Sequence, residues 1–337
     1  MEKSRKAAGP VSLATIAAAT DVSISTVSRI VNGQTHRASP ETVARVRQAV
    51  DRLGYKPNQI GRALKQGKSR VVAMLTANLN NPVMAMIASA TEAALRDIGH
   101  VMTLCDTHDR EDLQDDYLQA MRSQSVGGYI LVTNIKSPGL ADFVARGEPV
   151  VFACRPNPYS STPDAPGAFV GIDNEAAGAA AADRLWSRGC RTPVVIGPLE
   201  GSVVTREREA GFSRRMAELG ILPDRLAPAR APGLSHLDVG YAAARTLFAG
   251  STRPDGILCV SDQIAYGVYR AAMERGIRIP DDCLVVSIDG SDLNRWIAPW
   301  LESIHVPYAE FGRHIVDQLQ TIWRGETPGA ALLPFQV

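Results

Sequence analysis

The segment from Ile24 to Arg29 carries hydrogen-bonding side chains at helical spacing. Ser25 and Arg29 are four residues apart, so on a helix they share one face. A hydroxyl and a guanidinium group on one helix face can bind base edges in the major groove of DNA. Val27, Ile30 and Val31 of the same run form a separate apolar stripe. The spacing therefore predicts a helix with one face for a core and another for hydrogen bonds.

Two further helices are predicted around this one, and they would hold it in place. The pattern of apolar residues predicts helices over 13–19, 24–31 and 40–53, with Gly33 and Gly54 at the ends of the second and third. Each helix is preceded by a serine that can cap it, namely Ser12, Ser23 and Ser39. Two short helices joined by a tight turn indicate a helix-turn-helix, although a plain amphipathic bundle would show a similar pattern.

The charge of the chain is divided unevenly along its length. Residues 1–70 hold 13 Lys and Arg against four Asp and Glu, whereas residues 71–337 hold 23 against 31. The net charge of +1 therefore hides a basic part of +9 and an acidic part of −8. A small basic domain on a larger acidic body is typical of nucleic-acid binding, and a membrane surface is the weaker interpretation. This division favours the DNA-binding interpretation over the plain bundle.

A short segment with weak helical character follows the basic helices. Residues 59–65 are long enough for about two helical turns, but Gly61 interrupts them and Gly67 ends them. Isolated helices of this length are marginal in water, which predicts a linker that becomes ordered when something binds it.

Residues 71–337 alternate between apolar strand-like runs and amphipathic helices. Strands are predicted near 71–76, 101–105, 128–133, 149–153, 170–173, 193–196, 256–260, 284–288 and 302–306, and helices near 83–98, 111–124, 138–146, 175–187, 206–219, 236–248, 263–275 and 308–324. Such alternation predicts parallel sheets with helices on both faces. Because the run is too long for one doubly wound sheet, we expect two similar lobes, with a ligand in the cleft between them.

The sequence contains no catalytic or metal-binding pattern, so we predict no enzyme activity, no metal and no cofactor. The six histidines lack metal-ligand spacing, and the five cysteines are an odd number without a CxxC. Free thiols, the lack of an apolar stretch of 18 residues and the lack of a signal peptide predict a cytoplasmic protein that does not enter a membrane.

The basic part resembles the lactose/galactose-repressor family of transcriptional regulators. The resemblance is carried by VSLATIA at 11–17, by VSISTVSRIVNG at 22–33 and by the segment from Asn58 to Lys65. In that family a leucine that matches Leu64 wedges into the minor groove of the operator. Thr20 stands where the family usually has glycine, which implies some strain in the turn. We predict DNA contacts from Ser12, Leu13, Ile24, Ser25, Thr26, Ser28, Arg29, Asn32, Leu64 and Lys65.

The body resembles the effector domain of the same family, which shares its fold with periplasmic sugar-binding proteins. Landmarks include NPV at 81–83, VGIDN at 170–174, REREAGF at 206–212 and SDQIAYG at 261–267. Arg208 and Asp289 match the family's most regular effector contacts, and Val83 and Met84 match its cleft residues in the first lobe. Three positions that face the cleft in relatives depart from the family pattern, and they are occupied by Cys154-Arg155, Leu234 and Ser261. The resemblance therefore implies an effector site but leaves its ligand open.

The combined interpretation is a ligand-responsive transcriptional regulator of the repressor type. We expect a helix-turn-helix domain over 1–57, a hinge helix and linker over 58–70, and a two-lobed effector-binding and dimerisation domain over 71–337. Its expected partners are pseudo-palindromic operator DNA, a small effector such as a sugar or sugar derivative, and a second copy of the chain. A binding protein of the periplasmic type and an α/β enzyme are the alternatives. The binding protein is disfavoured because this chain has a basic helix-turn-helix and no signal peptide. The enzyme is disfavoured because it would need a phosphate or dinucleotide loop after an early strand, and this sequence has none.

Overall fold

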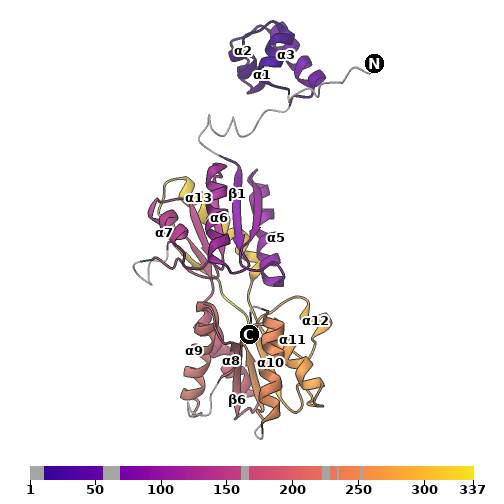
Figure 1. Cartoon of the computed structure of the whole chain (residues 1–337), viewed down its shortest axis with the longest axis vertical. Coiled ribbons are helices and arrows are strands. Elements are labelled where there is room, and N and C mark those ends of the chain that lie inside the picture. The colour runs from indigo at the N-terminus through magenta and orange to yellow at the C-terminus, as the bar shows by residue number, and fades with distance from the viewer. Residues whose placement is uncertain (1–10, 56–68, 161–166, 222–227, 234, 251–252) are drawn as a thin grey trace, which may run out of the picture. The chain divides into compact units, whose positions relative to one another are not determined.

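The chain divides into two compact units, Met1–Ser69 and Arg70–Val337, and each is described by itself. The structure is a computed structural model that describes residues 11–55, 69–160, 167–221, 228–233, 235–250 and 253–337 (Figure 1). The predicted hinge helix, with Leu64 and Lys65, lies outside these residues, and so does Leu234.

The first unit contains three helices around a small apolar core. They are α1 (Leu13–Thr20), α2 (Ile24–Val31) and α3 (Pro40–Leu53). The predicted serine caps are confirmed, because the hydroxyls of Ser12, Ser23 and Ser39 each accept a hydrogen bond from the backbone N–H three residues on. The core is formed by Ile16, Ala17, Val27, Ile30, Val46 and Ala49. This packing holds α2 with its buried stripe inward, as the sequence predicts.

The turn between α1 and α2 is not strained at Thr20. Thr20 is the last residue of α1, and its buried hydroxyl donates to the carbonyl of Ile16 at 2.7 Å. The left-handed residue of the turn is Asp21, with φ of 51°. Aspartate tolerates this conformation better than threonine does, so the strain expected from a missing glycine at Thr20 is wrong.

The second unit contains two parallel sheets. The first has the order β11-β5-β4-β3-β1-β2 and the second β10-β9-β8-β6-β7. The strands of the first sheet are β1 (Val71–Thr76), β2 (Val101–Asp106), β3 (Gly128–Val132), β4 (Val150–Ala153), β5 (Phe169–Gly171) and β11 (Ala330–Leu332). Those of the second are β6 (Pro193–Pro198), β7 (Ala229–Ala231), β8 (Gly256–Cys259), β9 (Leu284–Asp289) and β10 (Glu302–His305). The predicted two-lobed α/β architecture is therefore confirmed.

Helices cover both sheets. The first lobe has α5 (Pro82–Asp97), α6 (Glu111–Ser123), α7 (Pro138–Ala145) and α13 (Tyr308–Trp323), and the second has α8 (Asn174–Ser187), α9 (Val203–Glu218), α10 (His236–Ala249), α11 (Asp262–Met273) and α12 (Asn294–Ile297). Helix α9 begins three residues before the predicted start at Arg206, because Ser202 caps it. The short elements β7, β11 and α12 were not predicted.

The lobes are not two consecutive halves of the chain. Helix α13, which follows the second-lobe strand β10, packs against α5 of the first lobe. Gly312 permits this contact, since a Cβ there would lie 2.2 Å from the backbone of Ala90. After β11 the chain returns, and Gln336 forms an antiparallel bridge with His305 of β10. Together with the link from β5 to α8, three connections within the described residues therefore join the lobes.

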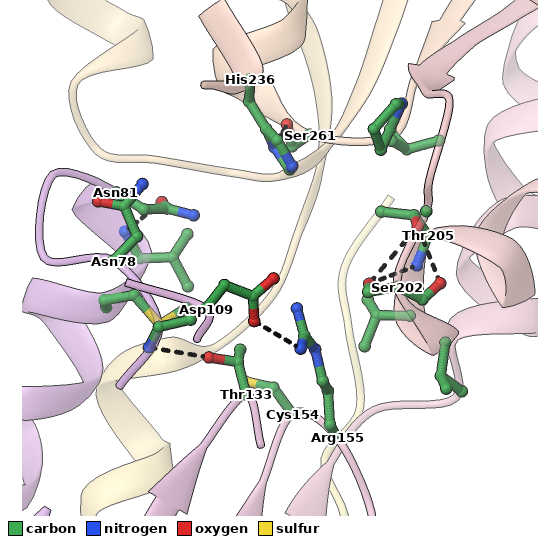
Figure 2. A pocket seen from close by; sticks show the side chains of 18 of the residues that line it. Asn78, Asn81, Asp109, Thr133, Cys154, Arg155, Ser202, Thr205, His236 and Ser261 are labelled. Atoms are coloured by element: carbon green, nitrogen blue, oxygen red, sulfur yellow. Dashed lines mark hydrogen bonds and ion pairs between the residues drawn. The ribbon is translucent and has the colours of Figure 1, made fainter. Parts of the chain in front are cut away.

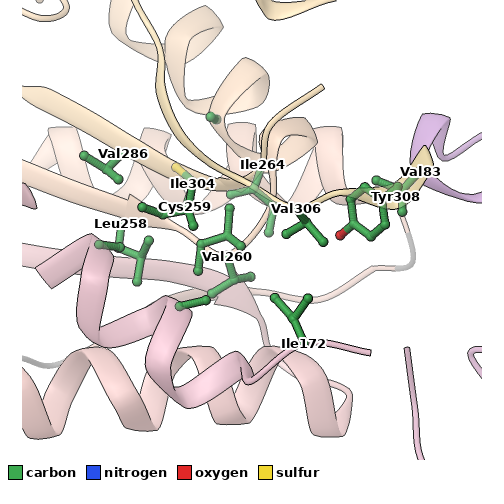
Figure 3. Packing of buried hydrophobic residues seen from close by; sticks show 14 of the residues in the cluster. Val83, Ile172, Leu258, Cys259, Val260, Ile264, Val286, Ile304, Val306 and Tyr308 are labelled. Carbon is green, nitrogen blue, oxygen red and sulfur yellow. The ribbon is translucent and has the colours of Figure 1, made fainter. Parts of the chain in front are cut away.

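The apolar core is continuous through these connections. Figure 3 shows the core of the second lobe, with Leu258 and Val286, leading toward Ile172 and Tyr308 near Val83 of the first lobe. Because Ile172, Val306 and Tyr308 of these connections are buried, they fix the side chains that face the cleft.

Candidate functional site

The exposed face of α2 carries the predicted base-reading residues. Ile24 is 52% exposed and Ser25 is also exposed. Nε of Arg29 donates to the backbone carbonyl of Ser25 at 3.3 Å, so the two residues lie on the same face. The hydroxyl of Ser25 is 3.0 Å from that of Ser23. The arrangement offers donors and acceptors that a bound base pair can compete for.

The other predicted contacts in this unit have structural partners as well. Nδ2 of Asn32 donates to the carbonyl of Ser28 at 2.7 Å at the end of α2. Ser12 forms a capping box with Thr15, and Leu13 packs against the core of the unit. These contacts place Ser12 and Asn32 at helix ends and leave Leu13 partly buried.

A cleft of about 990 Å³ lies between the two lobes of the second unit. Both lobes contribute to its lining. The predicted effector residues that line it are Val83, Met84, Arg155, Arg208, Ser261 and Asp289. Leu234 is outside the described residues, while its neighbours Gly233 and Ser235 line the cleft. The structure thus brings together six residues from five widely separated parts of the chain.

Arg208 and Asp289 form a buried ion pair on the second-lobe side of the cleft. Arg208 is 5% exposed and Asp289 is 6% exposed. Nη1 of Arg208 donates to Oδ1 of Asp289 at 3.3 Å and to the carbonyl of Val260 at 2.7 Å, while Nε donates to Asn174 at 3.1 Å. The hydroxyl of Tyr308 also donates to Oδ1 of Asp289, at 2.8 Å. This network fixes the guanidinium of Arg208 and the carboxylate of Asp289 on the second-lobe side of the cleft.

Close helix packing sets the position of Arg208. Arg208 lies on α9, and α9 crosses α8 at two glycines. A Cβ on Gly178 would lie 2.0 Å from the carbonyl oxygen of Arg208, and one on Gly211 would lie 1.9 Å from that of Glu175. Larger residues would force the helices apart and move the guanidinium from Asp289.

Burial changes the proton affinity of two cleft residues in opposite directions. Burial raises the pKa of Asp289 to about 6, although the Arg208 charge opposes the rise and Asp262 adds to it. Burial, with the charges of Arg208 and Arg155, lowers the pKa of His236 to about 4. His236 is therefore neutral near pH 7, and its Nδ1 lies 2.8 Å from the hydroxyl of Ser261. His236 and Ser261 together offer an uncharged polar site on the side of the cleft opposite the first lobe.

On the first-lobe side, Arg155 pairs with Asp109. Nη1 of Arg155 donates to Oδ1 of Asp109 at 3.0 Å and to the carbonyl of Asn134 at 3.2 Å. Figure 2 shows the Arg155 side chain rising beside Asp109 into the space that His236 and Ser202 also face. The cleft therefore carries one arginine–carboxylate pair on each lobe.

Sequence reasoning missed several residues of this site. His236, Tyr308, Asp109 and Asn134 all line the cleft. Each follows a strand or begins a helix, and the carboxyl ends of parallel strands are where ligands bind in such folds. That rule could have identified Asp109 and Asn134, which follow β2 and β3. Tyr308 could not have been found this way, because it requires the return of the chain to the first lobe.

Two negative findings apply to the described residues alone. There, no group of three or more His, Cys, Asp or Glu side chains is arranged to hold a metal ion. In the same part of the chain, no helix is long and apolar enough to cross a membrane.

Comparison with known proteins finds similarity to regulators along the chain. Residues 12–58 match the family described as bacterial regulatory proteins, lacI family, and residues 182–333 match the periplasmic binding protein-like domain. The HTH-type transcriptional regulator PtxS of Pseudomonas putida is 26% identical over 333 residues, which cover 97% of this chain and 93% of the relative. An uncharacterized HTH-type transcriptional regulator in the aml 5′ region of Streptomyces limosus is 31% identical over 305 residues, which cover 88% and 83%.

A solved structure shares the fold of the whole chain. The crystal structure of the lac repressor dimer bound to operator and the anti-inducer ONPF aligns with a TM-score of 0.81 at 23% identity, covering 97% of both chains.

Proposed function

Because this chain belongs to the LacI family of bacterial regulatory proteins, we propose that it is a repressor that binds operator DNA as a homodimer and responds to a small effector in its cleft. It is a sequence-specific DNA-binding transcriptional regulator and not an enzyme. The observation that carries the effector proposal is the cleft itself, where both lobes contribute charged side chains.

The DNA-binding role of the first unit rests on the exposed face of α2. Ser25 and Arg29 lie on that face, and Arg29 is the best candidate for a bidentate contact to guanine. We infer that Ile24, Thr26, Ser28 and Asn32 line the same interface, that Ser12 and Leu13 approach the DNA backbone, and that Leu64 and Lys65 contact the operator centre. The proposed division is 1–57 for this domain, 58–70 for the hinge and 71–337 for the body.

The effector role rests on coupling between the lobes. A ligand changes DNA affinity only if it binds one lobe arrangement better than another. Val83 and Met84 approach the cleft from the first lobe, and Arg208, Ser261 and Asp289 from the second, so a ligand that contacts both sets favours one arrangement. We infer that Arg155 and Leu234 belong to the same ligand site. The effector is a sugar or sugar derivative, and the protein acts in the cytoplasm, where the operator lies.

A second copy of the chain is the proposed occupant of the apolar surface at α12. Trp296 is 73% exposed and Ile297 is 61% exposed, and α12 has no buried residue. Large apolar side chains gathered on one element are typical of an interface. Trp296→Glu should convert the dimer to a monomer in analytical ultracentrifugation. Gln124→Glu is the charge-matched control, because it also adds one negative charge and lies at an exposed position after α6. A dimer that is equally stable in both variants would show that another surface holds it.

The experiment that tests the function is a gel shift of the full chain against fragments of its own genome. We expect a few fragments to bind far more tightly than the bulk, and we expect the shift of those fragments to change when small metabolites are added. Uniform affinity for all fragments would contradict the function.

A further inference from the structure

The guanidinium of Arg155 has N–H donors that the described part of the protein leaves without an acceptor. Among the described residues, both of its hydrogen bonds come from Nη1, one to Asp109 and one to the Asn134 carbonyl. Its Nε is buried and has no hydrogen-bond partner in that part of the chain. A buried donor without an acceptor is costly, so such groups call for an explanation. The edge of the guanidinium formed by Nε and Nη2 therefore has no acceptor among the described residues.

This edge is the one that binds carboxylates side-on. Nε and Nη2 point in parallel, and their spacing matches the two oxygens of a carboxylate or phosphate. The same chain uses the edge twice on its surface, where Arg110 binds Asp112 and Arg278 binds Asp282 through Nε and Nη2. In the cleft, Arg155 presents the matching edge without its carboxylate.

We propose that the effector carries an oxyanion, a carboxylate or a phosphate ester on a hydroxylated body, and that Arg155 binds this oxyanion through Nε and Nη2. The proposal rests on the effector cleft of the proposed function and names the ligand class for it. The hydroxylated body would face the second lobe, where Arg208 with Asp289 and His236 with Ser261 supply donors and acceptors. Arg155 is then the residue that selects an acid over a neutral sugar.

The rest of the lining agrees with an anionic ligand. The described lining residues include four Lys or Arg, which are Lys136, Arg155, Arg206 and Arg208, and three Asp or Glu, which are Asp109, Glu200 and Asp289. The Phe and Tyr side chains of the described lining are Tyr308 and Phe311, and both are almost fully buried. They offer no open ring face on which a neutral sugar could stack. Charge, rather than stacking, is the means of recognition that these residues provide.

A neutral ligand is the alternative, and the effect of substituting Asp109 distinguishes a neutral ligand from an acidic one. A neutral sugar would use Arg155 as a donor and Asp109 as an acceptor for its hydroxyls, so Asp109→Asn would weaken its binding. An oxyanion is repelled by the Asp109 carboxylate, so the same substitution would strengthen its binding. Asp109 has φ of 53°, a conformation that asparagine also adopts readily, so the backbone should be retained.

The experiment uses matched triples of probes with the full chain. Each triple contains a neutral hexose or pentose, its aldonic acid and its phosphate ester, and ligand binding is followed by thermal shift and then by calorimetry. We expect stabilisation by at least one acid or ester and none by its neutral parent. The comparison of acid with ester identifies which oxyanion the site takes. Equal stabilisation by the neutral parent, or none by any acid or ester at millimolar concentration, would overturn the proposal.

Three variants then test the assigned contact. Arg155→Gln should weaken oxyanion binding by about tenfold to a hundredfold, the range for a hydrogen bond to a charged group. Asp109→Asn should tighten it, whereas Arg110→Gln should leave it unchanged, because the guanidinium of Arg110 is on the surface and already pairs with Asp112. Weaker binding in Asp109→Asn would support the neutral ligand instead.

Failure of this inference is distinguishable from failure of the proposed function. The gel shift against genomic fragments is measured on the same preparations. Specific DNA binding that responds only to neutral metabolites would refute the oxyanion proposal and leave the regulator intact. Absence of specific DNA binding would count against the proposed function, whatever the cleft binds.

Discussion

The reading face of α2 and the cleft of the second unit hold their polar side chains in opposite ways. On α2, Arg29 is partly exposed and has a hydrogen bond of 3.3 Å to the Ser25 carbonyl. In the cleft, Arg208 is buried and bonded to Asn174, Val260 and Asp289. An exposed side chain can rearrange toward a base edge, whereas a buried network presents a fixed pattern to a small ligand. Substitution should therefore affect binding at the first site and both folding and binding at the second.

The largest expected effect is that of Arg208→Ala on stability. Removing one partner of a buried ion pair leaves the other charge unpaired, which costs about 3–5 kcal/mol. Urea unfolding of the full chain should show the transition of the second unit at lower denaturant, while Arg29→Ala shifts neither transition by more than about 0.5 kcal/mol. The double variant Arg208→Ala, Asp289→Asn should recover part of the loss. An unchanged transition in Arg208→Ala would show that the pair does not behave as a buried one.

Arg29→Ala should have the converse effect, on DNA recognition alone. Loss of a bidentate contact to guanine removes about 1–3 kcal/mol of discrimination at one position in each half-site. Operator binding by a set of single-base variants measures this. Arg37→Ala is a matched control, because Arg37 is an exposed arginine of the same unit that lies outside α2. If Arg29→Ala weakens all sequences equally, Arg29 contacts a phosphate and does not read a base.

The features that were predicted best from the sequence are those that depend on neighbouring residues alone. The serine caps, the left-handed glycines at 33 and 54, and the buried stripe of α2 each depend on a few neighbouring residues, and they were predicted at or near their observed bounds. The strand ends were also close, since continuous apolar runs mark buried parallel strands. For the cleft, the resemblance identified Arg208 and Asp289, which the structure then placed in contact.

What the sequence did not predict depends on long-range packing. Helix α13 returns to the first lobe because Gly312 fits against the backbone of α5, and no local pattern reports that contact. Tyr308 reaches Asp289 only through this return. Strand β11 has only three residues, of which Ala330 and Leu332 are exposed and Ala331 is partly buried. Its apolar pattern is therefore too short to identify it as a strand from the sequence. Pairing between distant segments is therefore the part that needs the structure.

The smallest expected effect is a difference in pH dependence within the cleft. Asp289 has its pKa raised from 3.8 to about 6, so between these values the folded state holds a proton that the unfolded chain has released. Its contribution to stability is greatest at the low end and falls as pH rises through about 6. His236 has its pKa lowered from 6.5 to about 4, so between these values the unfolded chain holds the extra proton. Its contribution therefore rises with pH over the same window.

Single substitutions should separate these opposing slopes. Each group can change the slope by at most about 1.4 kcal/mol per pH unit, the value for one proton. Between pH 4 and 6, Asp289→Asn should make the free energy of unfolding rise more steeply with pH than in the unsubstituted chain, and His236→Gln should make it rise less steeply. Urea unfolding at several pH values measures both slopes, and Asp281→Asn, at an exposed carboxyl, is the control. If the two variants changed the slope in the same direction, burial would not be what shifts the pKa values of Asp289 and His236. Opposite changes would show that the cleft holds both a protonatable acid and a neutral imidazole near pH 5, which the exposed face of α2 cannot do.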